Sequence, residues 1–387
     1  MFGLSRSVRL FTIFGFQVKL DASWLVLAFL IAWTLAVGLF PFQTPGLARG
    51  AYWWMGVAGA IGLFLSIVWH ELCHSLVARR YGLPMRGITL FIFGGVAEMS
   101  AEPPNARVEF LMAIAGPVSS LVLSGVCAAI HTTLRGYGPV APLAVIAYLA
   151  WVNMALALFN LIPAFPLDGG RVLRAALWQW RGNLPRATRI ASRIGSGFGI
   201  ALMALGVVQL FFGSLISAVW WFLIGMFLRG ASEASYQQLM IREALRGEPV
   251  RRFMNPEPVT VPPELSLRRL VEDYVYRYHH RMFPVVEQSH LVGCVSTEAI
   301  RALPPEEWDR HSVSEVARPC SVDNTISPDA DAAQALAAMN QTGNSRLMVV
   351  EGDRLVAIVA LKDLLGFLAL KLDLEAMDRH PPLPSPR

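Results

Sequence analysis

Six long apolar segments restrict this chain to membrane architectures. Each approaches the about 20 residues that a helix needs to cross the hydrocarbon core of a bilayer. They lie at about Ser23–Phe40, Tyr52–Ala78, Val108–Thr132, Val140–Ile162, Gly195–Phe212 and Ser214–Leu228. Charged residues make up 16% of the 387 residues, against about 25% in a typical soluble protein. The shortfall lies almost wholly before residue 230. The sequence therefore predicts a multi-pass α-helical membrane region of about six transmembrane helices, followed by a soluble region.

The arginines give these spans an orientation. They follow the second span, fill the loop between the fourth and fifth spans and close the sixth, at Arg79, Arg80, Arg86, Arg171, Arg174, Arg181, Arg186, Arg189, Arg193 and Arg229. The opposite loops hold only Arg49 and Arg135. Because cytoplasmic loops carry the excess of Lys and Arg, we predict that both termini are cytoplasmic and that the protein lies in the cell membrane. The arginines flank apolar runs and form no basic patch, so nucleic acid is not an expected partner.

The segment Gly87–Met99, between the second and third spans, is too short to cross a bilayer. Its β-branched and aromatic residues surround the pair Gly94-Gly95, which favours a membrane-associated β-hairpin. Such backbone is tolerated at membrane depth only where it packs on protein or lines a cavity. The alternative is a simple cytoplasmic loop.

Two histidines and a glutamate interrupt the second apolar run, in the stretch SIVWHELCHSLVARRYG. Ionisable groups inside transmembrane segments are costly and rarely kept without a function. At positions i and i+4, His70 and His74 project from the same side of a helix, a spacing that suits two nitrogens on one zinc ion. Glu71 is rotated off that axis, so it can act on a water molecule as a general base.

A catalytic zinc needs a third protein ligand, and Asp168 is the best candidate. It lies in NLIPAFPLDGGR at the end of the fourth span, just before the cytoplasmic Arg171, and His70 likewise lies about two turns before the cytoplasmic arginines that follow the second span. Both motifs are therefore expected in the cytoplasmic third of the bilayer. Asp168 has an alternative role as a helix N-cap. Asn160 could hydrogen-bond a scissile carbonyl as charge develops on it, or satisfy backbone groups near the two prolines.

The soluble region contains an internal repeat. After a charged helix and a Pro-rich linker, each half places a helix, a strand reading FPVVE or LMVVE, a turn, and a second strand leading to a helix. We predict a transmembrane domain over residues 1–230, a linker helix over 231–251, and an α/β pair over 252–370 with halves at about 252–310 and 311–370. The Pro-rich tail, 371–387, is predicted to be disordered.

Taken together, HELCH on one membrane helix and NLIPAFPLDGG after another resemble the site-2 protease family of intramembrane zinc metalloproteases. The resemblance covers about Phe11–Arg229. It implies one zinc ion per chain with His70, His74 and Asp168 as ligands, Glu71 as the catalytic base, and Asn160 as a substrate or oxyanion contact. It also implies hydrolysis within the transmembrane segment of a single-span membrane protein, with the hairpin pairing to the unwound substrate by strand addition.

The two C-terminal halves resemble a tandem pair of CBS domains. Such pairs often bind adenine nucleotides through a pattern of Gly, two apolar residues, Ser or Thr, two residues and Asp. The first half keeps Ser296 but has Ala299 at the Asp position, and the second keeps Asp363 but has Ala357 and Ala360 earlier in the pattern. Ser296 and Asp363 are therefore weak nucleotide candidates. A regulatory or dimerisation module, forming a homodimer through the CBS domains, is the favoured role.

Two other classes of function fit part of the sequence. One is a different membrane metalloprotease, which takes a glutamate from a second helix as third ligand and cleaves at the soluble side. The other is a CBS-regulated channel or transporter without protease activity, whose polar groups line a pore. The channel predicts ion flux that is insensitive to Glu71→Gln, and no stoichiometric zinc.

Overall fold

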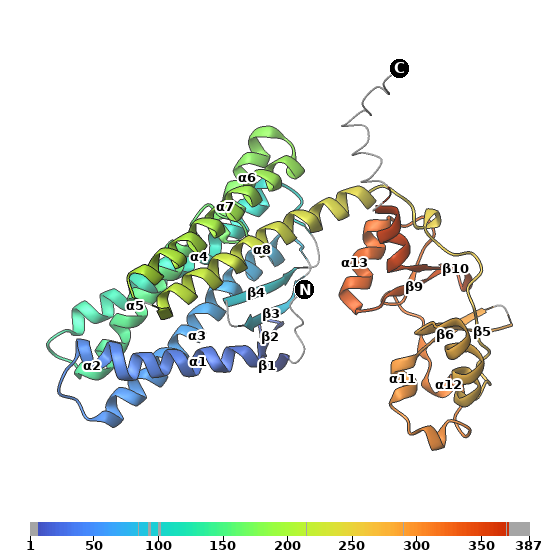
Figure 1. The fold of residues 1–387 in the computed structure, drawn as a ribbon, viewed down its shortest axis with the longest axis horizontal. Coiled ribbons are helices and arrows are strands. Elements are labelled where there is room, and N and C mark those ends of the chain that lie inside the picture. The colour runs from blue at the N-terminus through green and yellow to red at the C-terminus, as the bar shows by residue number, and fades with distance from the viewer. Residues whose placement is uncertain are drawn as a thin grey trace. The chain divides into compact units, whose positions relative to one another are not determined.

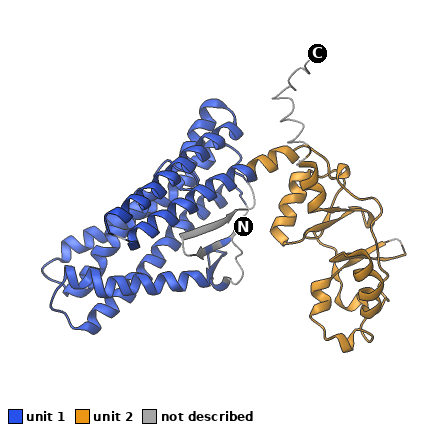
Figure 2. Ribbon diagram, in the orientation of Figure 1, with its two compact units in different colours: residues 1–238 blue, residues 239–387 orange. Residues whose placement is uncertain are grey.

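The computed structural model describes residues 7–83, 85–91, 94–99, 102–213, 215–288, 290–368 and 370. The chain divides into two compact units, residues 1–238 and 239–387 (Figure 2). The predicted disordered tail, 371–387, lies outside the described residues. Each unit has its own architecture.

Six helices of the described chain are long and apolar enough to cross a membrane, as predicted. The first is a continuous helical run made of α1 (Ala22–Thr34), a π-helical turn (Leu35–Leu39) and α2 (Phe40–Gln43). The others are α3 (Arg49–Arg80), α4 (Ala106–Leu134), α5 (Val140–Asn160), α7 (Leu184–Phe211) and α8 (Leu215–Leu245) (Figure 1). The prediction of six transmembrane helices is confirmed.

Several of these helices begin at a side-chain cap that their sequence supplies. Asp21 accepts a hydrogen bond from the Ser23 N–H at 2.9 Å ahead of α1, and Asn105 accepts one from the Val108 N–H at 2.9 Å ahead of α4. Asn183 caps α7 in the same way. Each cap satisfies one of the free N–H groups of a first helical turn, so polar residues at the ends of the apolar runs set where the helices start.

The last membrane helix is longer than the sequence analysis expects. The composition places the end of the sixth span at Leu228, ahead of a separate linker helix, but α8 continues without interruption to Leu245. The added segment, RGASEASYQQLMIREAL, is rich in good helix formers such as Ala, Glu, Gln and Leu, so helix propensity outweighs its single glycine. Its end belongs to the second unit, where Leu245 is fully buried in the core.

A four-stranded sheet packs beside the membrane helices, in the order β1-β2-β3-β4. The predicted hairpin is present as β3 (Met85–Phe91) and β4 (Gly94–Met99), which pair antiparallel. The N-terminal hairpin of β1 (Ser7–Ile13) and β2 (Phe16–Asp21) was not expected, and β2 joins the sheet by pairing parallel to β3. The sheet therefore lies where α1 begins and α3 ends (Figure 1).

Buried side chains fasten this sheet to the helices. Phe16 and Val18 of β2 form one apolar cluster with Trp24 of α1 and with Val68 and Leu72 of α3. Leu72 lies between the two histidines of the motif in sequence. The sheet is thus packed against the part of α3 that carries the candidate metal ligands.

Between the fourth and fifth spans lies a short helix, α6 (Asp168–Arg181), which the sequence analysis did not assign as a separate element. A tight turn over residues 161–167 connects it to α5. It ends at Gly182, whose φ of 65° lies in the left-handed region that glycine adopts without strain. This helix positions Asp168.

The second unit contains two similar α/β halves. One has the sheet β5-β6-β7 and the other β10-β9-β8. The strands are β5 (Met282–Glu287), β6 (His290–Ser296), β7 (Arg318–Pro319), β8 (Thr325–Ile326), β9 (Arg346–Glu351) and β10 (Arg354–Ala360). The helices are α9 (Leu267–Arg269), α10 (Tyr276–Tyr278), α11 (Thr297–Arg301), α12 (Val313–Val316) and α13 (Ala332–Thr342), with a π-helical stretch at Leu270–Val275, 3₁₀ turns at Val250–Arg252 and Pro305–Glu307, and a helical segment over 361–368.

Each half has an apolar core of its own. Phe283, Val285 and Val295 anchor the first, and Leu347 and Val349 anchor the second. These residues sit on paired strands, so the FPVVE and LMVVE segments supply equivalent parts of the two cores. The predicted α/β repeat is confirmed.

Candidate metal centre

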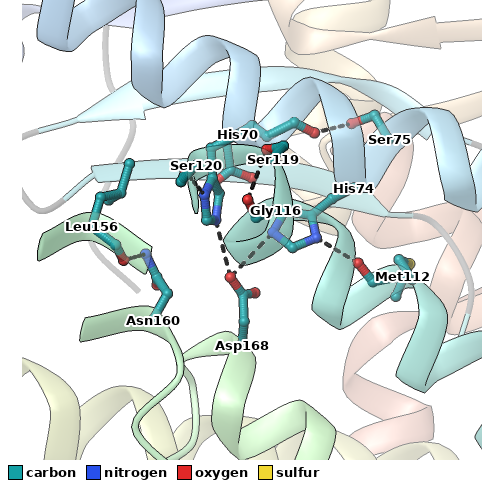
Figure 3. A network of polar contacts seen from close by, with 11 residues as sticks. His70, His74, Ser75, Met112, Gly116, Ser119, Ser120, Leu156, Asn160 and Asp168 are labelled. Atoms are coloured by element: carbon teal, nitrogen blue, oxygen red, sulfur yellow. Dashed lines mark hydrogen bonds and ion pairs between the residues drawn. The ribbon is translucent and has the colours of Figure 1, made fainter. Parts of the chain in front are cut away.

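His70, His74 and Asp168 meet inside the membrane unit. The two histidines lie on α3, and their Nε2 atoms are 3.0 Å and 3.1 Å from the same Asp168 oxygen, Oδ2 (Figure 3). All three residues are buried, and one donor atom from each lies within 4.8 Å of the others. The fold therefore joins two motifs that are separated by 98 residues of sequence.

Helix α4 orients both imidazole rings from behind. The Nδ1 atom of His70 is 2.8 Å from the Ser120 hydroxyl, and the Nδ1 atom of His74 is 2.6 Å from the Met112 carbonyl (Figure 3). A carbonyl only accepts hydrogen bonds, so Nδ1 of His74 carries the hydrogen and the Nε2 of the neutral ring presents a lone pair. The Nε2 lone pair and the Asp168 carboxylate oxygen, 3.1 Å apart, repel each other unless a cation or a proton lies between them. This set of two imidazoles and one carboxylate therefore fits a metal ion, zinc above all.

Gly116 keeps space free beside the two nitrogens. A Cβ atom at this position of α4 would lie 2.1 Å from Nε2 of His74 and 2.5 Å from Nε2 of His70. Every residue other than glycine would thus collide with the two atoms that face Asp168. A glycine at this position is therefore what lets the two rings lie this close to the backbone of α4.

Backbone packing sets the position of Asp168. A Cβ atom at Gly169 would lie 2.2 Å from the Leu161 carbonyl oxygen, and one at Gly170 would lie 2.3 Å from the Phe165 nitrogen. The two glycines thus let the start of α6 press against the preceding turn. The N-cap position belongs to Leu167, and Asp168 is the first residue of the helix with its side chain directed at the histidines. Capping is therefore not the role of Asp168 in this structure.

The other two predicted site residues lie close to this cluster. Glu71 follows His70 on α3, is partly buried, and its carbonyl accepts a hydrogen bond from the Ser75 hydroxyl at 2.9 Å. Asn160 is the last residue of α5, and its Nδ2 donates to the Leu156 carbonyl at 3.0 Å (Figure 3). In this conformation the Asn160 amide serves its own helix, which matches the structural alternative considered for it. Its contact with a substrate stays a prediction.

Sequence reasoning missed the contribution of α4. Glu109, Met112, Gly116 and Ser120 recur at intervals of three or four residues, so they lie on one face of this helix. Glu109 is fully buried and forms an ion pair with the buried Arg174 of α6, with N–O distances of 2.5 Å. The position of Glu109 at the edge of an apolar run was a signal in the sequence that this residue has a role. A backbone carbonyl such as that of Met112 has no sequence signature.

The two weak nucleotide candidates do not come together. Ser296 lines a cleft of about 730 Å³ in the second unit, and Asp363 lines a different one of about 720 Å³. Both volumes lie in the range of small-molecule sites, about 300–1,000 Å³. Ser296 also caps α11, since its hydroxyl accepts a hydrogen bond from the Ala299 N–H at 3.3 Å. Arg346 lines both clefts.

Both clefts carry an excess of cationic side chains. The cleft with Asp363 is lined by Arg252, Arg346 and Lys362 against two carboxylates, and His280 also lines it. Burial, with the positive charges of Arg346 and Lys362 nearby, lowers the pKa of His280. The cleft with Ser296 is lined by Arg281, Arg301, Arg318 and Arg346, also against two carboxylates. Each cleft is therefore suited to an anionic ligand.

Comparison with known proteins places both units. The profile of Peptidase family M50 matches residues 58–143 and 138–204, and that of the CBS domain matches residues 250–305 and 313–370. The chain is 34% identical over 360 residues to Rip3 of Mycobacterium tuberculosis, covering 92% of this chain and 91% of Rip3. It is 31% identical over 371 residues to zinc metalloprotease MJ0392 of Methanocaldococcus jannaschii, covering 95% of this chain and 97% of that protein.

A solved structure also matches part of this chain. The site-2 protease from Methanocaldococcus jannaschii is 30% identical to this chain, and the alignment covers 59% of this chain and 94% of that one with a TM-score of 0.41.

Proposed function

This chain belongs to peptidase family M50, the site-2 proteases, and we propose that it hydrolyses peptide bonds within the transmembrane segment of single-span membrane proteins. It is a multi-pass membrane zinc metalloendopeptidase with C-terminal CBS domains. We further propose the class of substrate, the place of cleavage and the role of each site residue.

One observation carries the proposal. The Nε2 atoms of His70 and His74 and the Oδ2 atom of Asp168 converge among membrane-spanning helices, and the two rings lie against α4 where Gly116 has no side chain. We assign these three side chains as the ligands of one zinc ion. Three protein ligands leave a fourth position open, as catalytic zinc sites require. A pore would not need this convergence of three potential ligands.

The chemistry divides among a few side chains. Zinc bound at this position supplies a Lewis acid that acidifies water and polarises a carbonyl. Glu71, next to His70 in the chain, takes the proton from the attacking water and later gives it to the leaving amine. Asn160 turns its amide from the Leu156 carbonyl toward the carbonyl oxygen of the substrate, where negative charge develops. The water adds to the carbonyl carbon, and the C–N bond breaks as the amine is protonated.

The substrate must lose its helical structure before it is cut, because a helix shields its carbonyl groups. β4 is the end strand of the sheet order, so its outer edge can pair with an extended segment. We propose that the substrate adds to β4 as a strand and that residues which weaken helix near the cut promote cleavage.

The second unit is proposed to regulate the protease or to dimerise it. Its two cationic clefts have the size and charge for adenine nucleotides, and a homodimer would form through the CBS domains. We place the protein in the cell membrane. The arginine distribution supports a cytoplasmic location for both termini and for the CBS domains. The proposed domain limits remain those of the sequence analysis, with the protease over residues 1–230 and the CBS pair over 252–370.

The test is cleavage of a single-span peptide with a helix-weakening centre, reconstituted with the wild type or with Glu71→Gln. We expect cleavage by the wild type alone and one zinc ion per chain in both proteins. Asp168→Ala should remove the zinc and the activity together, whereas a protease with a different third ligand would keep both. If neither the wild type nor the variant cut any of several peptides and neither held zinc, the proposal would be wrong, and a CBS-regulated channel would explain the chain better.

A further inference from the structure

We propose that the buried ion pair of Glu109 and Arg174 is a positioning device, which fixes Asp168 at the correct distance from the two histidines. This inference rests on the proposed function, since it concerns the three proposed zinc ligands. Neither residue touches the metal cluster. Both act through the helices that carry the ligands and the residues behind them.

Helix α4 is the common reference for all three ligands. Its Met112 carbonyl and Ser120 hydroxyl hold the rings of His74 and His70 at 2.6 Å and 2.8 Å. Glu109, one turn before Met112 on the same helix, holds Arg174 of α6 at 2.5 Å. The same surface of α4 therefore aligns the histidines of α3 and the helix that begins with the aspartate.

Arg174 also contacts the turn that precedes Asp168. Its guanidinium lies over the Phe165 ring, with its Cζ atom 5.1 Å from the ring centroid. The carbonyl of Phe165 accepts a hydrogen bond from the buried hydroxyl of Ser232 on α8. The turn is therefore held from both sides, by a side chain of α6 and by one of α8. A shift of Arg174 would move this turn and, with it, the first residue of α6.

Stability does not explain why such a pair is kept. Glu109 has no exposed surface and Arg174 is 5% exposed, so both charges have lost their hydration. Among the described residues the second carboxylate oxygen of Glu109 has no hydrogen-bond partner. Buried ion pairs of this kind can often be replaced by apolar residues without loss of stability, although removal of one partner alone is harmful. What apolar residues cannot reproduce is the fixed geometry of a guanidinium against a carboxylate.

The experiment compares metal binding in the full-length protein in detergent. The main variant is the double substitution Glu109→Met and Arg174→Met, which removes both buried charges at once and leaves the partly exposed Glu102, the second partner of Arg174 at 3.4 Å, in place. Arg181→Met is the matched control, because Arg181 lies on the same helix and interacts with Trp180. Three properties are measured for each protein: thermal unfolding, zinc affinity by competition with a chelator, and the visible spectrum of the cobalt-substituted form.

The positioning role predicts a folded double variant that binds zinc more weakly, by up to the about 10- to 100-fold that loss of a group hydrogen-bonded directly to a metal ligand causes. Its cobalt spectrum should differ from that of the wild type, because the carboxylate ligand is displaced, while Arg181→Met should match the wild type. If the double variant binds zinc with wild-type affinity and gives the wild-type cobalt spectrum, the pair is structural only and the inference is wrong.

Two further proteins separate the possible failures. If the double variant does not fold, Arg174→Lys decides, because lysine keeps the charge but lacks the planar fork and its stacking on Phe165. Weakened zinc binding by a folded Arg174→Lys supports the inference, and wild-type affinity overturns it. Asp168→Ala tests the assignment of the zinc ligands, on which the inference rests. If that variant keeps its zinc, the proposed ligand set fails, whatever the ion pair does.

Discussion

The two units both bury apolar residues, but they differ in how many polar residues they bury. Among the described residues, every buried polar or charged side chain except Asn324 belongs to the membrane unit. The cores of the second unit are apolar clusters. The membrane unit also exposes large apolar side chains along its spans, as Leu25 of α1 shows with 60% exposure, whereas Leu347 of β9 is fully buried.

The difference follows from the solvent around each unit. In water, burial of apolar surface is the main force that favours folding. Within lipid an apolar side chain gains little from burial, so packing and polar contacts hold the helices together. The interior of a membrane protein can therefore hold ionisable groups, and those it holds are costly enough to mark a function. Changes inside the first unit should damage chemistry, and changes inside the second should damage stability.

The strongest test of this contrast is Gly116→Ala. The added methyl group would overlap the Nε2 atoms of His70 and His74, so we expect loss of stoichiometric zinc and of all peptidase activity. The helix itself should not suffer, because alanine favours helix more than glycine does. Metal analysis and a cleavage assay measure the effect. Gly125→Ala is the control on the same helix, where a Cβ atom meets nothing within 4 Å, and zinc in both variants would refute the steric argument.

Leu347→Ala should have the next largest effect, on stability. Removal of a fully buried leucine from the core of the second unit should cost about 2–5 kcal/mol of unfolding free energy. Zinc content should not change. Calorimetry of the full chain in detergent, with Leu25→Ala as the lipid-facing control, compares the two solvents directly. Equal destabilisation by the two substitutions would contradict the contrast.

A smaller effect is expected from Arg346→Ala on anion binding. Arg346 lines both clefts of the second unit, and loss of a charged hydrogen bond costs about 1.5–3 kcal/mol. Binding of adenine nucleotide, followed by calorimetric titration of the full chain, should therefore weaken about 10- to 100-fold. The control is Arg354→Ala, an exposed arginine on the neighbouring strand. Unchanged affinity in the Arg346 variant would exclude both clefts as the nucleotide site.

The smallest effect concerns the stability of the second unit at low pH. Hydrogen bonds from His311 and from the hydroxyl and backbone of Ser312 lower the pKa of Glu315 to about 2. A lowered pKa in the folded state contributes stability above the unfolded value of about 4.3 and loses it as the pH falls toward 2. Glu315→Gln should thus lower the melting temperature of the second unit at pH 7 and have little effect near pH 2. Glu351→Gln, another exposed carboxylate of this unit, serves as the control, and a difference that persists in acid would contradict the assignment.

Features that depend on a local pattern of residues could be predicted from the sequence. Apolar runs locate membrane helices because the bilayer requires a length of about 20 residues. The spacing of His70 and His74 and the separate motif around Asp168 indicated residues that the fold does bring together. The hairpin of β3 and β4 was also readable, from its composition around a glycine pair.

The rest depends on contacts between distant segments. The strands β1 and β2 occupy the segment SVRLFTIFGFQVKLD, whose apolar residues run almost directly into the first apolar span, and the parallel pairing of β2 with β3 leaves no local pattern. The partners of the histidine Nδ1 atoms come from α4, 50 residues away for His70 and 38 for His74. The single helix α8 reads as two because a change of composition at Leu228 resembles a boundary, although good helix formers carry the helix on.

The contact between Phe165 and Ser232 has a consequence for biosynthesis. Ser232 lies 64 positions after Asp168 in the chain. Because ribosomes add about 5–20 residues per second, about 3–13 s separate the synthesis of these two residues. During that interval a nascent chain carries all three proposed ligands but lacks the Ser232 hydroxyl, which holds the turn before Asp168. Proteolytic competence should therefore follow insertion of the last span, so that an incomplete chain is a poor protease in the membrane that receives it.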